Sequence, residues 1–295
     1  MKVVSCGILG LVACGSGSSG PDAYVKTCVK DGGEVCFQLP TAALTDRDGN
    51  PSTLGCGQIV PKPAPAAVTF SGKVTKYGVS TIIPGVQLEA FTDVGLQNRV
   101  ANATSAADGT YSLTVPQGTP DLMWTRSTAG DPFLVTYVYN FHAPLDQGNY
   151  TMFNLQIVTP DNIESAALLV KEIWDPTKHV IAGTVLDCNR IVVQHAEISV
   201  SSTSGTRTFV DGVSTYYGVP GAVPIVAPPD QRGDTNDNGA FAVFHLPPDQ
   251  PYYVQAWGFL DDAAVAQGEA GLTMLQEVPI NVAVNAATSM NLWLK

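Results

Sequence analysis

The four histidines are the side chains of this sequence with the widest range of chemistry, because a neutral imidazole acts as a general base or binds zinc. They are His142, His179, His195 and His245. None belongs to an H-E-x-x-H motif or to the H-x-x-E pair of zinc carboxypeptidases. The sequence also has no G-x-S-x-G motif, no P-loop and no G-x-G-x-x-G after a strand. We therefore predict a protein that is not an enzyme and holds no metal and no cofactor.

Two acidic loops resemble the start of a calcium-binding loop. In the first, residues 46–50, Pro51 stands where glycine is required and Gly57 where the bidentate glutamate belongs, so we interpret it as a turn. The second, residues 234–239, matches positions 1, 3, 5 and 6 of the loop, but His245 stands at position 12 and strand-like sequence flanks it. A hairpin turn is the preferred interpretation of this second loop, and calcium binding is the alternative.

Four aromatic residues are candidates for ligand contact, because aromatic rings bury a large area at low entropic cost and stack on sugars. They are Tyr216, Tyr217, Trp124 and Trp257. The two tyrosines lie in a proline-rich stretch, residues 209–233, which we predict to be an insertion that is too long for an ordinary loop. The alternative is that both tyrosines fold back onto their domain.

The length and the charge exclude several classes of protein. The 295 residues are enough for two domains, each with its own core. The formal net charge of −11 argues against nucleic acid as a partner, since phosphates need a basic surface. The longest apolar run, residues 3–14, is shorter than the roughly 20 residues that span a bilayer, so we expect no transmembrane helix.

The first residues have the pattern of a secretory signal, with Lys2 followed by a short apolar stretch. Its end, L-V-A-C at residues 11–14, resembles a bacterial lipobox. This resemblance implies that residues 1–13 are a signal peptide and that Cys14 carries a diacylglycerol and an acyl chain such as palmitate, with the membrane as a partner. Residues 14–21 are then the lipidated cysteine and a Gly/Ser tether. A plain signal peptide is the alternative.

Four of the six cysteines remain once residues 1–13, which include Cys6, are removed and Cys14 is assigned to lipid. An even number in an oxidising compartment favours disulfides. We predict the pairs Cys28–Cys36 and Cys56–Cys188. The first pair flanks a turn at residues 31–33, and four cysteines allow three connectivities. Cys28, Cys36 and Cys56 lie in a small segment, residues 22–67, which also contains a Pro-rich linker. A zinc site is the rival interpretation, but no C-x₂-C spacing occurs.

Beyond this segment the sequence consists of short, β-branched, alternating runs separated by Gly, Pro, Asn and Asp, which is typical of an all-β sandwich. It also contains an internal repeat. Residues 71–74 match residues 182–185, and a D/N-G turn precedes an aromatic residue in both copies, at residues 107–111 and 237–241.

This repeated order resembles the carboxypeptidase regulatory-like domain, a transthyretin-like β-sandwich. The resemblance implies two tandem transthyretin-like or Ig-like sandwiches, residues 68–158 and 179–295, as accessory domains without their peptidase. The second copy departs from the family pattern at His195-Ala196, where Pro-Gly is usual.

One short helix is predicted between the sandwiches, in a connector of residues 159–178. Asp161 and Glu164 are spaced as a capping box behind Pro160, and the Asp-Pro pair at residues 175–176 ends the helix. One apolar stripe recurs at helical spacing: Ile163, Ala167, Val170 and Trp174. We expect the helix to pack between the sandwiches or to cap the first, with partner binding as the alternative.

These patterns predict a non-catalytic, membrane-anchored surface or periplasmic lipoprotein with a binding, adhesion or structural role, whose partner is a polysaccharide or a surface protein. Gly15 follows Cys14, where an aspartate would retain a lipoprotein in the inner membrane of enteric bacteria, so we expect the outer membrane of a Gram-negative cell envelope. Two alternatives stay open. One is a carbohydrate-binding module, because starch-binding domains share the fold, and the other is a hydrolase with an unrecognised carboxylate pair.

Overall fold

The computed structural model describes residues 25–30, 33–54, 67–116, 123–141, 149–151, 154–208, 210, 212–218, 226–227, 233–248 and 250–294. Within this part the fold is all-β, as predicted, with short helices. The predicted signal peptide, Cys14 and the tether lie outside the described residues. Among the residues that are described, no helix is both long enough and apolar enough to cross a bilayer.

The strands up to the helical connector are β1 (Val25–Lys30), β2 (Gly33–Gln38), β3 (Thr45–Asp46), β4 (Ala67–Lys76), β5 (Gln87–Phe91), β6 (Arg99–Thr104), β7 (Thr110–Pro116), β8 (Met123–Thr128), β9 (Val135–Phe141), β10 (Asn149–Tyr150) and β11 (Leu155–Ile157). The strands after it are β12 (His179–Leu186), β13 (Val193–Gln194), β14 (Glu197–Ser201), β15 (Ser214–Gly218), β16 (Val226–Ala227), β17 (Ala240–Leu246), β18 (Tyr252–Gly258), β19 (Thr273–Ile280) and β20 (Ala286–Trp293). The helices are α1 (Pro160–Leu169), α2 (Asp262–Ala266) and the 3₁₀ helix η2 (Gly268–Gly271).

The first half of the fold packs two layers of strands around an apolar core. Strand β4 pairs with β7 on one edge and with β10 and β11 on the other, while β5 pairs with β6 and β8 in the second layer. Alternate residues of β7 are buried, namely Tyr111, Leu113 and Val115, and the residues between them are exposed. This is the period-2 pattern of a strand with one face toward a core.

The second half of the fold has its own core between two sheets. Strands β14, β18 and β19 form a three-stranded sheet, and Ile198 and Val254 from it share a core with Ile181 and Val243 of the larger sheet. The first half has a cluster of its own, but Phe91, Tyr137 and Tyr139 from that half pack into the core of the second half.

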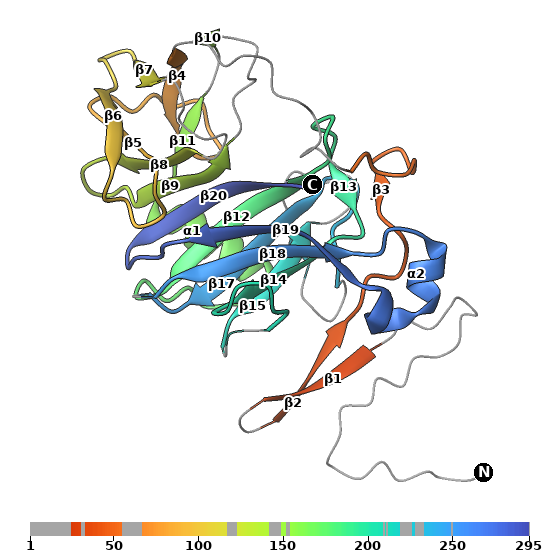
Figure 1. The fold of residues 1–295 in the computed structure, drawn as a ribbon. Helices are drawn as coiled ribbons and strands as arrows, with labels where there is room; N and C mark the ends of the chain where they lie inside the picture. Colours follow the sequence, from red (N-terminus) through yellow and green to blue (C-terminus); the bar gives the residue numbers. More distant parts are fainter. Residues whose placement is uncertain are drawn as a thin grey trace, which may run out of the picture.

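One continuous sheet joins the two halves, which the repeat pattern did not predict. Nine strands follow in the order β16-β15-β17-β12-β20-β9-β8-β5-β6. The junction is the parallel pair β9–β20, which runs from Val135 opposite Ala286 to Tyr139 opposite Met290. In Figure 1 the olive-green strand β9 lies beside the dark blue strand β20.

The two predicted D/N-G turns are structurally equivalent. Gly109 has φ 75° and Gly239 has φ 60°, the left-handed region that favours glycine. In the first half the N–H of Val74 donates to the carbonyl of Gly109 at 2.9 Å, and in the second half the N–H of Val185 donates to that of Gly239 at 2.9 Å. The two turns therefore hold equivalent pairs of strands in the two halves: β4 with β7 in the first and β12 with β17 in the second.

The N-terminal segment packs onto the second half. Leu44 belongs to the core of that half, and β3 pairs with β13. The loop at residues 46–50 is a turn, as interpreted from the sequence, in which Asp46 Oδ1 accepts the backbone N–H groups of Asp48 and Asn50 at 2.9 Å each. These bonds keep the pKa of Asp46 below its usual value, although burial opposes them.

The start of α1 differs from the predicted capping box. The N-cap is Thr159, whose N–H and hydroxyl donate to Asn162 Oδ1 at 3.0 Å and 2.8 Å. The box predicted from Asp161 and Glu164 was therefore wrong by two positions. Pro160 occupies the first helical turn, where its missing N–H costs nothing, and this shifts the cap to the residue before it.

The end of α1 also differs from the prediction. The helix ends at Leu169, before the Asp-Pro pair at residues 175–176. Lys171 adopts φ 61°, and the N–H of Glu172 donates back to the carbonyl of Ala167 at 2.9 Å. A left-handed residue with this bond satisfies the last carbonyls of a helix, so the chain turns away without a proline.

The predicted apolar stripe is confirmed in part. Ile163 and Ala167 lie on the buried side of α1, whereas Val170 is its C-cap and Trp174 follows it, although all four pack together. They pack with Val180, Phe244 and Ala287 of the second half and with Leu134 and Val158 of the first. The helix therefore contacts both halves and covers part of one face of the shared sheet.

The two predicted disulfides stay predictions. Strands β1 and β2 align Cys28 with Val35 and Cys36 with Thr27, so the two cysteines are offset by one residue, and their side chains lie outside the described part. Cys188 is disulfide-bonded. Cys56, its predicted partner, lies outside the described residues.

We expect peptide mapping without reduction to recover a peptide that joins Cys56 to Cys188. The N–H of Cys188 donates to the carbonyl of Thr53 at 3.1 Å, and Asn189 Nδ2 donates to Thr53 Oγ1 at 3.0 Å, so the chain three residues before Cys56 is already held beside Cys188. Mass spectrometry of alkylated, unreduced protein measures this link. A peptide joining Cys188 to Cys28 or Cys36 would contradict the pairing.

Candidate functional site

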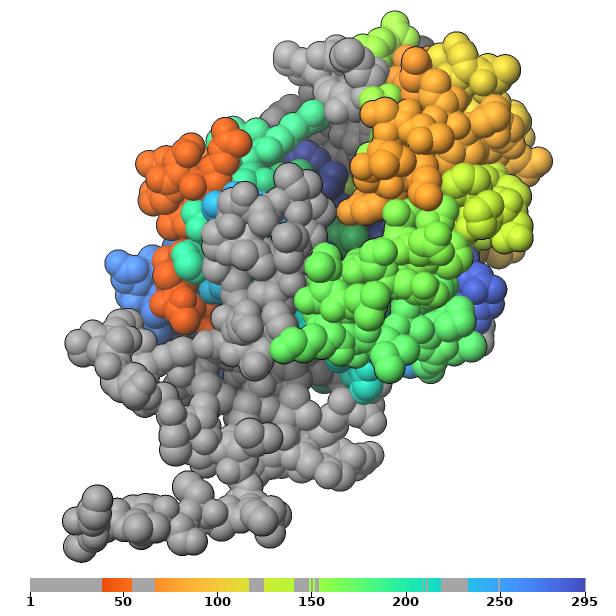
Figure 2. Space-filling view, turned by 180° about the vertical axis from the view of Figure 1, so that it is seen from behind, coloured from red at the N-terminus to blue at the C-terminus, as the bar shows by residue number. Residues whose placement is uncertain are grey.

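A cavity of about 390 Å³ lies on one face of the shared sheet, and we call it the sheet-face cavity. Strands β9, β20, β12 and β17 form its floor, and residues of β11 and α1 together with Tyr77 form its walls. In Figure 2 the surface is hollowed between the orange atoms of the β4 region and the green atoms of the α1 region. Sites for small molecules have volumes of roughly 300–1,000 Å³, so this cavity is large enough to hold one.

The floor is open because its strands present small side chains on this face. One row of cross-strand neighbours consists of Val138, Ser289, Ala182 and Ala242. The next row consists of Asn291, Thr184 and Ala240. Ala182 and Ser289 are exposed although they lie at the centre of a nine-stranded sheet. Sequence analysis missed this site, and its signal was the recurrence of small residues at alternate positions of β12, β17 and β20.

Uncharged hydrogen-bonding groups line the cavity. They include the hydroxyls of Thr184 and Ser289 and the amides of Gln156, Asn162 and Asn291. In the described part of the chain, the side chains of Thr184, Ser289, Gln156 and Asn291 make no hydrogen bond to protein. The lining consists of apolar, hydroxyl, phenol and amide side chains, which suits hydrogen bonding to an uncharged molecule.

His179 is linked to the cavity through Thr288, which lines it. The imidazole is fully buried at the start of β12, with Nδ1 3.1 Å from the carbonyl oxygen of Ala283 and Nε2 2.8 Å from Thr288 Oγ1. Nδ1 also lies 3.4 Å from the backbone nitrogen of Ala283. The shorter contact, to a carbonyl that only accepts, favours the tautomer with the hydrogen on Nδ1, in which Nε2 accepts from the threonine. Burial lowers the pKa of His179 from 6.5 to about 4, so the ring is neutral at neutral pH.

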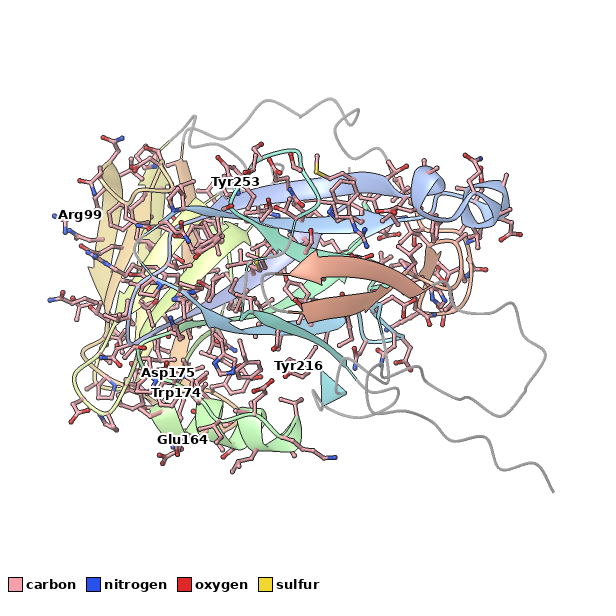
Figure 3. All side chains as sticks on the ribbon, turned by 90° about the horizontal axis from the view of Figure 1, so that it is seen from below. Arg99, Glu164, Trp174, Asp175, Tyr216 and Tyr253 are labelled. Carbon is pink, nitrogen blue, oxygen red and sulfur yellow. The ribbon has the colours of Figure 1, made fainter. Side chains whose placement is uncertain are left out.

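Glu172 fixes the segment after α1 to the sheet. The hydroxyl of Tyr216 donates to Glu172 Oε1, and His245 Nε2 lies 3.2 Å from Glu172 Oε2. Burial raises the pKa of Tyr216, so its hydroxyl remains a donor. Figure 3 shows Tyr216 between α1 and the strands, whereas Glu164 points away from the sheet. These bonds hold the α1 wall of the cavity against β15 and β17.

Tyr216 and Tyr217, the two tyrosines named as candidates for ligand contact, are buried in this structure. Both lie in β15, which pairs with β17 within the large sheet, and they are only 2% and 4% exposed. Tyr216 packs edge-on against Phe244 beneath α1, with ring centroids 5.7 Å apart, and the hydroxyl of Tyr217 accepts the N–H of Ile198 at 2.8 Å. Consecutive residues of a strand point to opposite faces, and here both faces are covered.

The two predicted tryptophans do not complete an aromatic site. Trp257 is half-buried in β18, and its Nε1–H donates to Ser199 Oγ at 3.0 Å and Gln255 Oε1 at 3.1 Å. It belongs to the three-stranded sheet, whereas Tyr216 lies beneath α1, on the large sheet. Trp124 lies in β8, and its side chain is outside the described part.

The loop at residues 234–239 is a turn in this structure. Asn236 Oδ1 accepts the N–H of Asn238, and Asn238 Oδ1 accepts the N–H of Ala240, both at 2.9 Å, while Asp234 Oδ2 lies 3.1 Å from His195 Nδ1. The carboxamide oxygens that calcium would need therefore serve the backbone. Among the described residues there is no group of three or more His, Cys, Asp or Glu side chains placed to hold a metal ion.

No family model and no curated protein matches this sequence. Among solved structures, the shaft pilin SpaA of Lactobacillus rhamnosus GG is 9% identical, with 78% of this chain and 98% of that chain covered and a TM-score of 0.23. A DUF3823 family protein from Parabacteroides merdae is 14% identical, with 74% and 100% covered and a TM-score of 0.23. The major pilin subunit BcpA of Bacillus cereus is 11% identical, with 92% and 78% covered and a TM-score of 0.22. At these TM-scores none of the three carries an argument about what this chain does.

Proposed function

We propose that this chain is a non-catalytic, lipid-anchored protein of the bacterial cell envelope that binds an uncharged ligand in the sheet-face cavity. The composition of the cavity lining carries this proposal. Its floor exposes small side chains, and hydroxyl and amide groups without protein partners in the described part surround them. A site of this kind forms hydrogen bonds to neutral groups, while a charged group entering it would lose its hydration without gaining a counter-charge.

The anchoring part of the proposal rests on the lipobox-like residues 11–14, and we expect Cys14→Ser to remove it. Two or more acyl chains hold a protein stably on a bilayer, so loss of the modified thiol should abolish palmitate labelling and move the protein to the soluble fraction. Metabolic labelling and membrane fractionation measure both effects. Unchanged labelling of the variant would show that Cys14 is not the lipid site.

The binding part predicts that Ala182→Trp blocks the cavity. Ala182 is exposed in the middle of the floor, so an indole there occupies the space without entering the core. We expect at least one class among neutral oligosaccharides, uncharged apolar compounds and peptides to raise the melting temperature of the wild-type mature protein but not of this variant. Ala263→Trp, at an exposed position of α2, is the matched control and should behave like the wild type.

Two results would contradict cavity binding. One is the absence of any stabilising compound from the three classes. The other is a compound that stabilises the wild type and Ala182→Trp equally, which would place its site elsewhere. Unchanged circular dichroism of the two tryptophan variants verifies that each has folded.

A further inference from the structure

We infer that the ligand of the sheet-face cavity is a short neutral saccharide. This inference rests on the proposed function, because it names the ligand class of the same cavity. A sugar ring presents C–H groups on its faces and hydroxyl groups around its edge. The cavity has to offer a complement to both.

The floor places apolar groups, which suit the faces of a sugar ring, next to hydrogen-bonding groups, which suit its edge. Ala182 and Ser289 are directly opposite each other on β12 and β20, so a methyl group and a hydroxyl lie side by side, both exposed. Thr184 and Asn291, both half-buried, face each other two residues further along these strands and add a hydroxyl and an amide. Hydroxyls donate and accept hydrogen bonds, as sugar hydroxyls do, so either partner in such a contact can take either role.

The wall on the β11 side adds amides and an aromatic ring. Gln156 and Asn154 are exposed there, and Asn154 Oδ1 accepts the N–H of Lys73 at 3.0 Å, which orients its NH₂ group as a donor for other partners. Tyr77 lines the same wall and is 36% exposed. An exposed aromatic ring beside amide donors and acceptors provides a surface for the C–H face of a sugar together with bonds for its hydroxyls.

Charge and topology disfavour other ligand classes. Among the described residues that line the cavity an anionic ligand would meet no cationic group, and the net charge of −11 repels it. A peptide that binds by strand addition needs a free strand edge. Here β12 is paired with β17 and β20, and β20 with β12 and β9, so the floor offers side chains and no free backbone edge.

Isothermal titration of the wild-type mature protein with neutral gluco-, manno- and galacto-configured oligosaccharides, and with their uronic acid counterparts, tests this inference. We expect at least one neutral sugar to bind more tightly than its uronic acid counterpart. Ser289→Ala and Gln156→Ala should each raise its Kd about 3- to 10-fold, since each removes one neutral hydrogen bond. Ala182→Trp should abolish binding, and Ala263→Trp should leave it unchanged.

The possible failures are distinct. If no neutral saccharide binds, or if uronic acids bind more tightly, the saccharide inference is overturned. If only peptides or apolar compounds bind and Ala182→Trp blocks them, the proposed function survives and the saccharide class is wrong. If a saccharide binds equally well to Ala182→Trp, the sugar site lies outside this cavity.

Discussion

Replacing Arg207 with alanine is expected to lower the free energy of unfolding by about 3–5 kcal/mol, the usual cost of leaving a buried charge without its partner. Arg207 lies in the loop between β14 and β15, and its side chain is 10% exposed. Its Nε and Nη2 donate to the two carboxylate oxygens of Glu197 at 2.6–3.0 Å, and the Glu197 side chain is 4% exposed. Without the guanidinium, that carboxylate keeps its desolvation cost and loses its counter-charge.

Urea unfolding of the wild type and Arg207→Ala measures this loss. Burial raises the pKa of Glu197, although Arg207 opposes the shift, so the deficit of the variant should shrink as the pH is lowered and the carboxyl takes up a proton. Arg99→Ala is the matched control. Arg99 is 52% exposed and its partner Glu89 is also bonded by Arg126, so its loss should cost less than about 1 kcal/mol. Equal losses in the two variants would contradict the argument.

Between pH 7 and pH 4 the wild type is expected to lose about 3 kcal/mol of stability through His179 alone. The pKa of this residue is about 4 in the folded protein and 6.5 in an unfolded chain, and one pKa unit corresponds to about 1.4 kcal/mol. Above pH 6.5 the imidazole is neutral in both states and its contribution is constant. As the pH falls from 6.5 toward 4, only the unfolded state binds the proton, so unfolding becomes more favourable.

Comparison with His179→Gln separates this contribution from those of other titrating groups. The amide preserves a donor and an acceptor but does not titrate, so the free energy of unfolding of the variant should depend less on pH over this window. Parallel pH profiles of the two proteins would contradict the prediction. An NMR titration that places the pKa of His179 near 6.5 in the folded protein would do so as well.

Local patterns were sufficient to predict an all-β fold, the alternation of β7 and the two D/N-G turns. Alternating burial in β7 follows directly from the alternation of apolar and polar residues, because side chains of a strand point to opposite faces in turn. The turns at Gly109 and Gly239 follow from residue type, because both positions require positive φ. The burial of Ile163 and Ala167 follows from helical spacing, since residues four apart lie on one side of any helix regardless of what the helix packs against.

The caps of α1 show the limit of local patterns. Asp161 and Glu164 have the right spacing for a capping box, but the box forms between Thr159 and Asn162. Several residues near a helix start are able to cap it, and the choice among them depends on where Pro160 and the packing against the sheet fix the first turn.

Tertiary structure alone decided what the second half buries and what it leaves open. Tyr216 and Tyr217 look like surface aromatics in a long insertion, yet β15 pairs with β17 and is covered on both faces. Ala182 and Ser289 show the opposite outcome. They lie in the middle strands of the large sheet, where burial is expected, yet they are exposed. Both outcomes depend on which strands meet and on what lies above the sheet, because burial arises from contacts between distant segments. The sequence by itself therefore determined the alternation of β7, the two glycine turns and the apolar side of α1, whereas the pairing of β9 with β20 and the position of α1 determined the cavity.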